Sequence, residues 1–136
     1  MSNYTEILQV PFLIHKVERF DVEGKRILEH NKKFYFNDIG LRNSLKLVME
    51  KDRAKLLENL VFLHLIKLGY TVRVGNLGDK EIDFIIQKGE KKAYIQVAYL
   101  LGEGETRERE FGNLLEIKDA FPKYVVSAEP LASDYL

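Results

Sequence analysis

The segment EIDFIIQKGEKKAYIQVAYL, residues 81–100, constrains the fold more than any other part of the chain. It contains two apolar runs separated by the polar stretch QKGEKK, and each run carries one polar residue, Asp83 in the first and Gln96 in the second. Two apolar runs of strand length around a glycine-containing turn are typical of a β-hairpin. The sequence therefore predicts a hairpin whose apolar runs hold a carboxylate and an amide.

The register of this hairpin decides whether the two polar side chains meet. Glycine at the first central position of a two-residue turn suits a type II′ turn, so we place the turn at residues 89–90. Lys88 then lies opposite Lys91, and Asp83 lies opposite Gln96, on one face of the sheet with Cβ atoms about 5 Å apart. A shift of one residue would separate Asp83 and Gln96 onto opposite faces.

A carboxylate inside an apolar run is costly to bury unless it is paired, hydrogen-bonded or bound to a metal. Asp83 therefore has two readings. It lies near a sheet edge, where it caps backbone N–H groups or meets a Lys or Arg, or it belongs to a metal site.

The remaining pattern predicts a mixed α/β (α+β) fold. Residues 53–70 form a helix with so wide an apolar stripe that we expect burial on more than one side, ended by Gly69. From there the order is α-β-β-β-α-β, with the second helix starting at residue 105 or 106 and one helix on each side of a central mixed sheet. Before it, residues 11–22 and 33–38 form a hairpin with a polar connection at 24–32, and residues 41–49 form a short helix.

Composition narrows the classes of function. The chain has 136 residues, which suits one domain, and equal numbers of basic and acidic residues, which counts against avid non-specific binding to nucleic acid. There is no cysteine, so disulfides and thiolate metal sites are excluded and a cytoplasmic location is expected. No apolar run approaches the ~18 residues of a membrane span, so no membrane partner is expected. The chain contains no G-x-x-x-x-G-K-[ST], and hence no ATP site of that type.

Three places in the sequence resemble a known motif. Glu58 in the helix, Asp83 in EIDFII and the triplet Gln96-Val97-Ala98 in YIQVAY stand where the restriction-endonuclease-like, PD-(D/E)XK superfamily has a helical acid, a strand acid and an acid-x-Lys triplet. The phrases FLIHKVERFD, KFYFNDIGLRNSL, LLENLVFLHLIKLGY and FPKYVVS extend the likeness over nearly the whole chain. In combination they resemble the C-terminal domain of bacterial and archaeal AAA-type ATPases, a domain with no assigned function.

The resemblance implies a domain layout and a site. Residues 1–52 would form the N-terminal hairpin, short helix and connecting segment, and residues 53–136 the nuclease-like core, together one compact domain of a longer ATPase. Glu58, Asp83 and Gln96 would be the metal ligands and catalytic residues, with Mg²⁺ or Mn²⁺ as the cofactor and DNA and the parent's ATPase module as partners.

The triplet departs from the motif at two positions. Gln96 replaces an acid, and its carbonyl can still bind a metal but adds no negative charge. Ala98 replaces the lysine, and a methyl group cannot orient or deprotonate water. The candidates for a substitute are Lys55, Lys80 and Lys92.

Three functions follow. The departures favour a degenerate nuclease-fold domain that serves an ATPase as a nucleic-acid-binding or interaction module. The alternatives are an active Mg²⁺-dependent endonuclease acting on DNA, and a structural or oligomerisation domain without nucleic-acid contact. Metal binding near Asp83 and salt-dependent DNA binding distinguish these functions.

Overall fold

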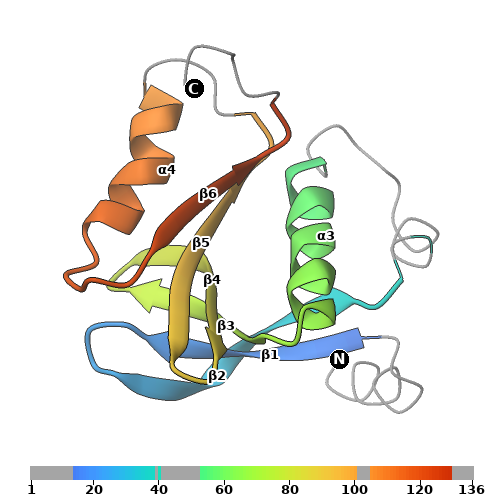
Figure 1. The fold of residues 1–136 in the computed structure, drawn as a ribbon, viewed down its shortest axis with the longest axis horizontal. Coiled ribbons are helices and arrows are strands. Elements are labelled where there is room, and N and C mark those ends of the chain that lie inside the picture. Colours follow the sequence, from blue (N-terminus) through green and yellow to red (C-terminus); the bar gives the residue numbers. More distant parts are fainter. Residues whose placement is uncertain (1–13, 39, 41–52, 101–104, 130–136) are drawn as a thin grey trace.

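The computed structural model describes residues 14–38, 40, 53–100 and 105–129, which form one mixed sheet with helices on both faces (Figure 1). The sheet has six strands in the order β2-β1-β3-β4-β5-β6. The β1/β3 and β5/β6 pairs are parallel and the other three pairs are antiparallel. Neither described helix is long and apolar enough to cross a membrane. The elements are β1 (Ile14–Asp21), β2 (Arg26–Phe36), α3 (Arg53–Lys67), β3 (Thr71–Leu77), β4 (Lys80–Lys88), β5 (Lys91–Ala98), α4 (Glu105–Leu115) and β6 (Lys123–Ser127).

From residue 53 onward the predicted order α-β-β-β-α-β is confirmed, with α3 and α4 on opposite faces of the sheet (Figure 1). Each face has its own apolar core. We call the buried cluster that contains Phe62 and Phe84 the α3 core, and the cluster that contains Tyr94 and Leu114 the α4 core. Each central strand contributes alternate side chains to the two cores, which explains its nearly continuous apolar sequence.

Helix α3 buries a narrower face than its composition suggests. Asn59, Phe62 and Leu65 are buried, whereas Leu60 and Ile66 are 47% and 37% exposed. The expectation of burial on more than one side is therefore wrong for the described structure, because the fully buried positions are spaced three apart, with Val61 and Leu63 partly buried against the same core. The predicted stop is confirmed, since Gly69 adopts a φ of +88°, which glycine tolerates best.

The N-terminal hairpin is present, but its turn lies earlier than expected. The turn occupies residues 22–25, and β2 begins directly after it, so the predicted polar connection at 24–32 is largely strand. Val17 lies opposite Lys33 and Arg19 lies opposite Leu28, which leaves residues 29–32 as a bulge against one residue of β1. Polar side chains are acceptable here because β2 is an edge strand with one exposed face. The helix predicted at 41–49 lies outside the described residues.

The hairpin of β4 and β5 has the predicted register. Lys88 pairs with Lys91 and Phe84 pairs with Ile95, around a turn in which Gly89 has a φ of +60°. Positive φ at the first central residue alone matches the expected type II′ turn. Counted away from the turn, the last main-chain pair of the two strands is Phe84 with Ile95, and Asp83 is the next residue of β4.

Candidate functional site

A bulge in β4 places Asp83 on the α3 side of the sheet. Opposite β3, the two residues Asp83 and Phe84 face the single residue Val74. As a result Ile82 packs in the α4 core and Phe84 in the α3 core, although residues two apart in a regular strand share a face. Asp83 is buried between them, and its Oδ2 accepts a 2.7 Å hydrogen bond from the backbone N–H of Val97.

Gln96 lies on the other face of the sheet. Ile95 and Val97 pack with the α3 core, so alternation directs Gln96 to the α4 side. Its β6 neighbour Val125 packs with the α4 core, which gives the same orientation. The predicted shared face of Asp83 and Gln96 is therefore wrong, because the bulge has the effect of a one-residue shift. Contact remains, since the buried Gln96 Oε1 accepts a hydrogen bond of 3.2 Å from the Asp83 N–H.

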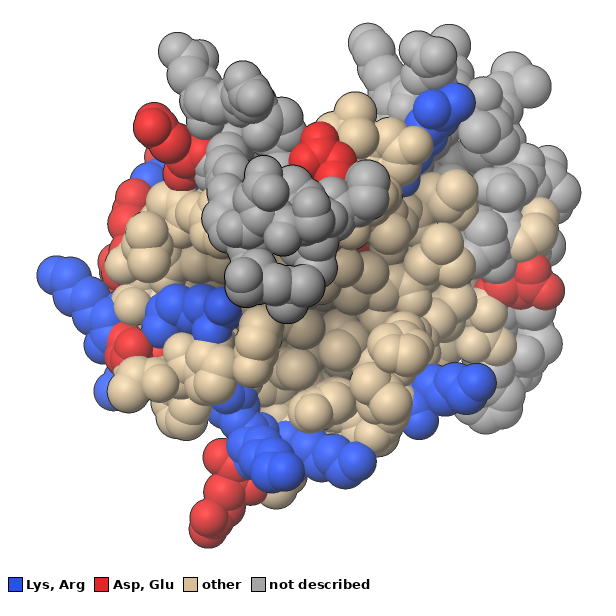
Figure 2. All heavy atoms as spheres, turned by 45° about the horizontal axis from the view of Figure 1, so that its top comes forward, with Lys and Arg blue, Asp and Glu red and all other residues tan. Residues whose placement is uncertain are grey.

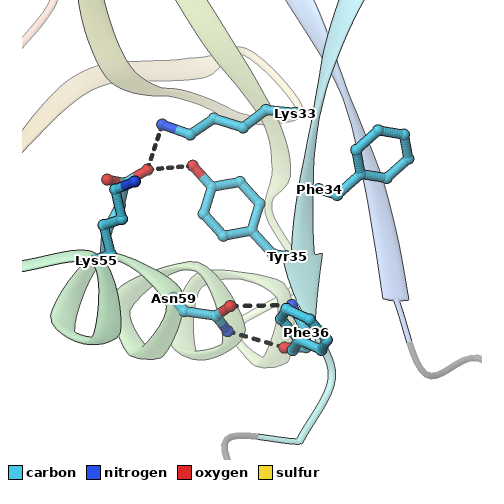
Figure 3. A pocket seen from close by; sticks show the side chains of 7 residues that line it. Lys33, Phe34, Tyr35, Phe36, Lys55 and Asn59 are labelled. Carbon is cyan, nitrogen blue, oxygen red and sulfur yellow. Dashed lines mark hydrogen bonds and ion pairs between the residues drawn. The ribbon is translucent and has the colours of Figure 1, made fainter. Parts of the chain in front are cut away.

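Glu58 on α3 contacts two side chains of β2, those of Lys33 and Tyr35, which Figure 3 labels. Its Oε1 lies 2.6 Å from Nζ of Lys33 and accepts a 2.5 Å hydrogen bond from the hydroxyl of Tyr35. The Tyr35 ring stacks on Phe62 at a centroid distance of 4.5 Å, which fixes the hydroxyl beneath the helix. Sequence reasoning placed Glu58 in the site but missed Lys33 and Tyr35.

Glu81 brings a second acid to Lys33. Its Oε1 lies 2.8 Å from Lys33 Nζ, and its Oε2 lies 2.7 Å from NH1 of Arg19. Arg19 also donates to Oδ1 of Asn76, so β1, β2, β3, β4 and α3 all contribute to one network. We call Arg19, Lys33, Tyr35, Glu58, Glu81 and Asp83 the charge cluster.

The electrostatics of the charge cluster act in opposite directions on Asp83 and Glu81. Burial, and then the charge of Glu58, raise the pKa of Asp83 to about 7. Burial raises the pKa of Glu81, but hydrogen bonds from Lys33 and Arg19 outweigh it and the net shift is downward. Burial lowers the pKa of Lys33, and the two glutamates more than reverse this, so its ammonium stays charged. Asp83 therefore holds its proton up to near-neutral pH, whereas the pKa of Glu81 is lowered.

The three predicted substitutes for the missing lysine lie in different places. Lys80 pairs with Glu116 on the α4 side, and Lys92 Nζ lies 5.1 Å from the centre of the Phe121 ring. Lys55 lines a pocket together with Glu58 and Lys33, but Lys33 is the lysine in contact with the acids. The signal for Lys33 was weak, since only the two-residue spacing of Lys33 and Tyr35 in KFYF places both on one strand face.

Asn59, next to Glu58, connects α3 to the edge strand β2 through hydrogen bonds. Its amide accepts a 2.9 Å hydrogen bond from the N–H of Phe36 and donates one of 2.8 Å to the carbonyl oxygen of the same residue (Figure 3). The side chain thus satisfies the backbone of β2 as a neighbouring strand would. The consecutive helix residues Glu58 and Asn59 therefore both bond to β2. Together with Lys55 and residues 33–36 of β2, they line the pocket of Figure 3.

These donors do not fit the divalent metal that the motif implies. Mg²⁺ needs near-octahedral oxygen ligands, and among the described residues no group of three His, Cys, Asp or Glu side chains converges suitably. The Gln96 oxygen accepts from a backbone amide, and the ammonium of Lys33 lies between Glu58 and Glu81. The chain's own cations therefore balance the acids of the charge cluster.

Comparison with known proteins gives relatives without a described activity. Residues 1–53 match the model of a domain of unknown function (DUF8612). An uncharacterized protein of Haemophilus influenzae is 38% identical over 129 residues, which are 95% of this chain and 32% of that protein. The uncharacterized protein MJ1544 of Methanocaldococcus jannaschii is 38% identical over 113 residues, 79% of this chain and 24% of that protein. The chain thus spans about a third or less of the length of these curated relatives. No solved structure matches it.

Proposed function

We propose that the chain is a restriction-endonuclease-like domain that does not cut nucleic acid and serves as an interaction module of a longer, ATPase-type protein. The support for the fold is the order α-β-β-β-α-β, with a helix on each face of a mixed sheet and with Glu58 and Asp83 drawn into one cluster. The support for a longer protein is that both curated relatives extend well beyond the matched region.

One observation supports the proposal that the domain does not cut nucleic acid. The Lys33 ammonium bridges Oε1 of Glu58 and Oε1 of Glu81, at 2.6 and 2.8 Å. A cation supplied by the chain makes the carboxylates a structural network, because it compensates their charge and one oxygen of each carboxylate contacts the Lys33 ammonium. A hydrolytic metal site instead needs ligand oxygens open to the metal and a position open to water.

The experiment compares the wild-type chain with the double variant E58Q/D83N. We expect no cleavage of plasmid or single-stranded DNA in millimolar Mn²⁺ above the level of the variant, and no heat of Mn²⁺ binding by calorimetry. Mn²⁺-dependent cleavage that the double variant loses would overturn the proposal, and Lys33 would then replace the lysine missing at Ala98.

A second measurement separates an interaction module from a DNA-binding domain. Binding through phosphates weakens steeply with salt. We expect no salt-dependent binding of duplex DNA at 50–200 mM salt, because the chain has a net charge of zero. In the view of Figure 2, basic side chains lie around the margin of a broad uncharged area instead of forming a stripe. Binding that falls with added salt would assign the module to DNA.

A further inference from the structure

A groove of about 360 Å³ lies at the end of the β4–β5 hairpin, on the α3 side of the sheet. Ile86 and Ala93, a cross-strand pair of the α3 core, form its floor. Tyr70, directly before β3, and the exposed rings of Phe121 and Tyr124 form its walls. The groove is open at this point because the side chain of Ala93 is small, and we call it the hairpin groove.

The hairpin groove is apolar, yet the mouth of the groove is basic. Lys88 and Lys91 pair directly across the strands on the face of Ile86 and Ala93, and Lys92 follows. Glu90, the acid of this turn, also lines the groove. Like charges directly opposite each other destabilise a sheet, so a negatively charged occupant would remove an unfavourable interaction.

Lys88 has a structural role, and Lys91 does not share it. Lys88 Nζ donates to the carbonyl oxygen of Leu68 at the end of α3, and lies 5.7 Å from the centre of the Tyr70 ring. The ammonium of Lys88 therefore already has partners within the fold. Lys91 is exposed and lines the groove, so its charge is available to a ligand.

We propose that the hairpin groove docks an acidic peptide segment of a partner protein, with an apolar side chain over Ala93 and a carboxylate near Lys91. The proposal rests on the proposed role as an interaction module and names its surface. Charge complementarity supports an anionic partner, since Lys91 and Lys92 line the groove and Glu90 is the one acid among its lining residues. The placement of the lysines favours a peptide over a nucleic acid, because they gather at the hairpin turn, whereas a phosphate backbone needs a continuous basic groove.

Selection from a random 12-residue peptide display library on the immobilised wild-type chain tests this proposal. We expect the enriched peptides to be rich in Asp and Glu around an aliphatic or aromatic residue. Fluorescence polarisation of an enriched peptide should then show at least tenfold weaker binding to Lys91→Glu and to Tyr124→Ala. The controls are Lys16→Glu and Phe34→Ala, an exposed pair at the opposite edge of the sheet, and these should leave binding unchanged.

A second measurement on the wild-type chain does not depend on the folding of variants. Replacing the acids of the enriched peptide by amides should also weaken binding at least tenfold. Absence of enrichment, selection of neutral or basic peptides, or equal binding by Lys91→Glu would overturn the proposal. Binding of oligo(dT)12 that Lys91→Glu abolishes would also overturn it, in favour of nucleic acid. Mn²⁺-dependent cleavage would overturn the non-cutting role without changing any of these peptide results.

Discussion

The ammonium of Lys33 on β2 lies 2.6 Å from a carboxylate oxygen of Glu58 on α3, so an edge strand and a helix are joined by a half-buried ion pair. The contact connects the N-terminal hairpin with helix α3. It also accounts for the charge balance of the charge cluster without a metal.

Removing Lys33 should lower the stability of the folded chain. Lys33→Met leaves Glu58 and Glu81 without their shared cation, and we expect a loss of about 2 kcal/mol in the free energy of unfolding. Urea denaturation measures it, with the exposed Lys16→Met as the control. In a double-mutant cycle, adding Glu58→Gln should recover part of the loss. Additive losses would mean that Lys33 and Glu58 do not interact in solution.

Asp83 should make stability depend on pH in a direction unusual for a carboxylate. Its pKa of about 7 in the folded chain exceeds the value near 4 of an unfolded aspartate, so the folded state binds the extra proton between these two pH values. This contribution to stability is present at low pH and is lost as the pH rises through 7. Asp83→Asn removes the titration.

Between pH 5 and pH 7 the wild-type chain should lose ~1.4 kcal/mol of stability per pH unit through Asp83, whereas Asp83→Asn should not. The stability of Asp83→Asn relative to wild type should therefore rise by about 2–3 kcal/mol between pH 5 and pH 8. Urea denaturation of both proteins at the two pH values gives the difference. A difference that is the same at both values would contradict the raised pKa.

Asn59 should be more important for stability than its exposed neighbour. Asn59→Ala removes both hydrogen bonds to the backbone of Phe36 and should cost about 2–3 kcal/mol, because a buried N–H and C=O lose their partner. Leu60→Ala, one position along and 47% exposed, should cost less than about 1 kcal/mol. Thermal unfolding followed by circular dichroism compares the two variants. Equal losses of stability would argue against a stabilising role of the two Asn59 hydrogen bonds.

Two glycines should respond in opposite directions to alanine. At Gly75 an added Cβ would lie 2.9 Å from Cβ of Ile82 and 3.0 Å from Cδ1 of Ile85, so Gly75→Ala should lose about 1–3 kcal/mol through overpacking. At Gly112 in α4 an added Cβ has no neighbour within 4 Å, and Gly112→Ala should gain about 0.5–1 kcal/mol. Chemical denaturation of both variants checks the signs, and a stabilised Gly75→Ala would show that β3 and β4 are not so closely packed.

Much of the fold was predictable because local signals agreed with one another. Gly89 fixed the hairpin register, Gly69 ended the helix, and the apolar runs identified the central strands. The bulges were not predictable, because nothing in EIDFII or in residues 29–32 marks an inserted residue. One bulge separates Asp83 from Gln96, and the other places Lys33 opposite Val17, facing α3.

The candidate site was predictable only where it follows the motif. Of the three residues that the motif indicates, the structure brings Glu58 and Asp83 into one cluster, where Glu58 adds to the raised pKa of Asp83, and it places Gln96 on the other face of the sheet. Lys33 and Arg19 come from strands that the motif does not include, so their contacts with the acids depend on tertiary pairing. A spacing rule within one hairpin cannot reveal such partners.

The parallel pairing of β1 with β3 has a consequence for the order of folding. It joins Arg19 to Val74 and Asp21 to Asn76, residues far apart in the chain, whereas the two hairpins close over short distances. Non-local pairing is slow because the chain entropy is lost before the contacts form. We expect each hairpin to form early and the seam between them to close last. The charge cluster spans that seam, so its assembly marks the end of folding.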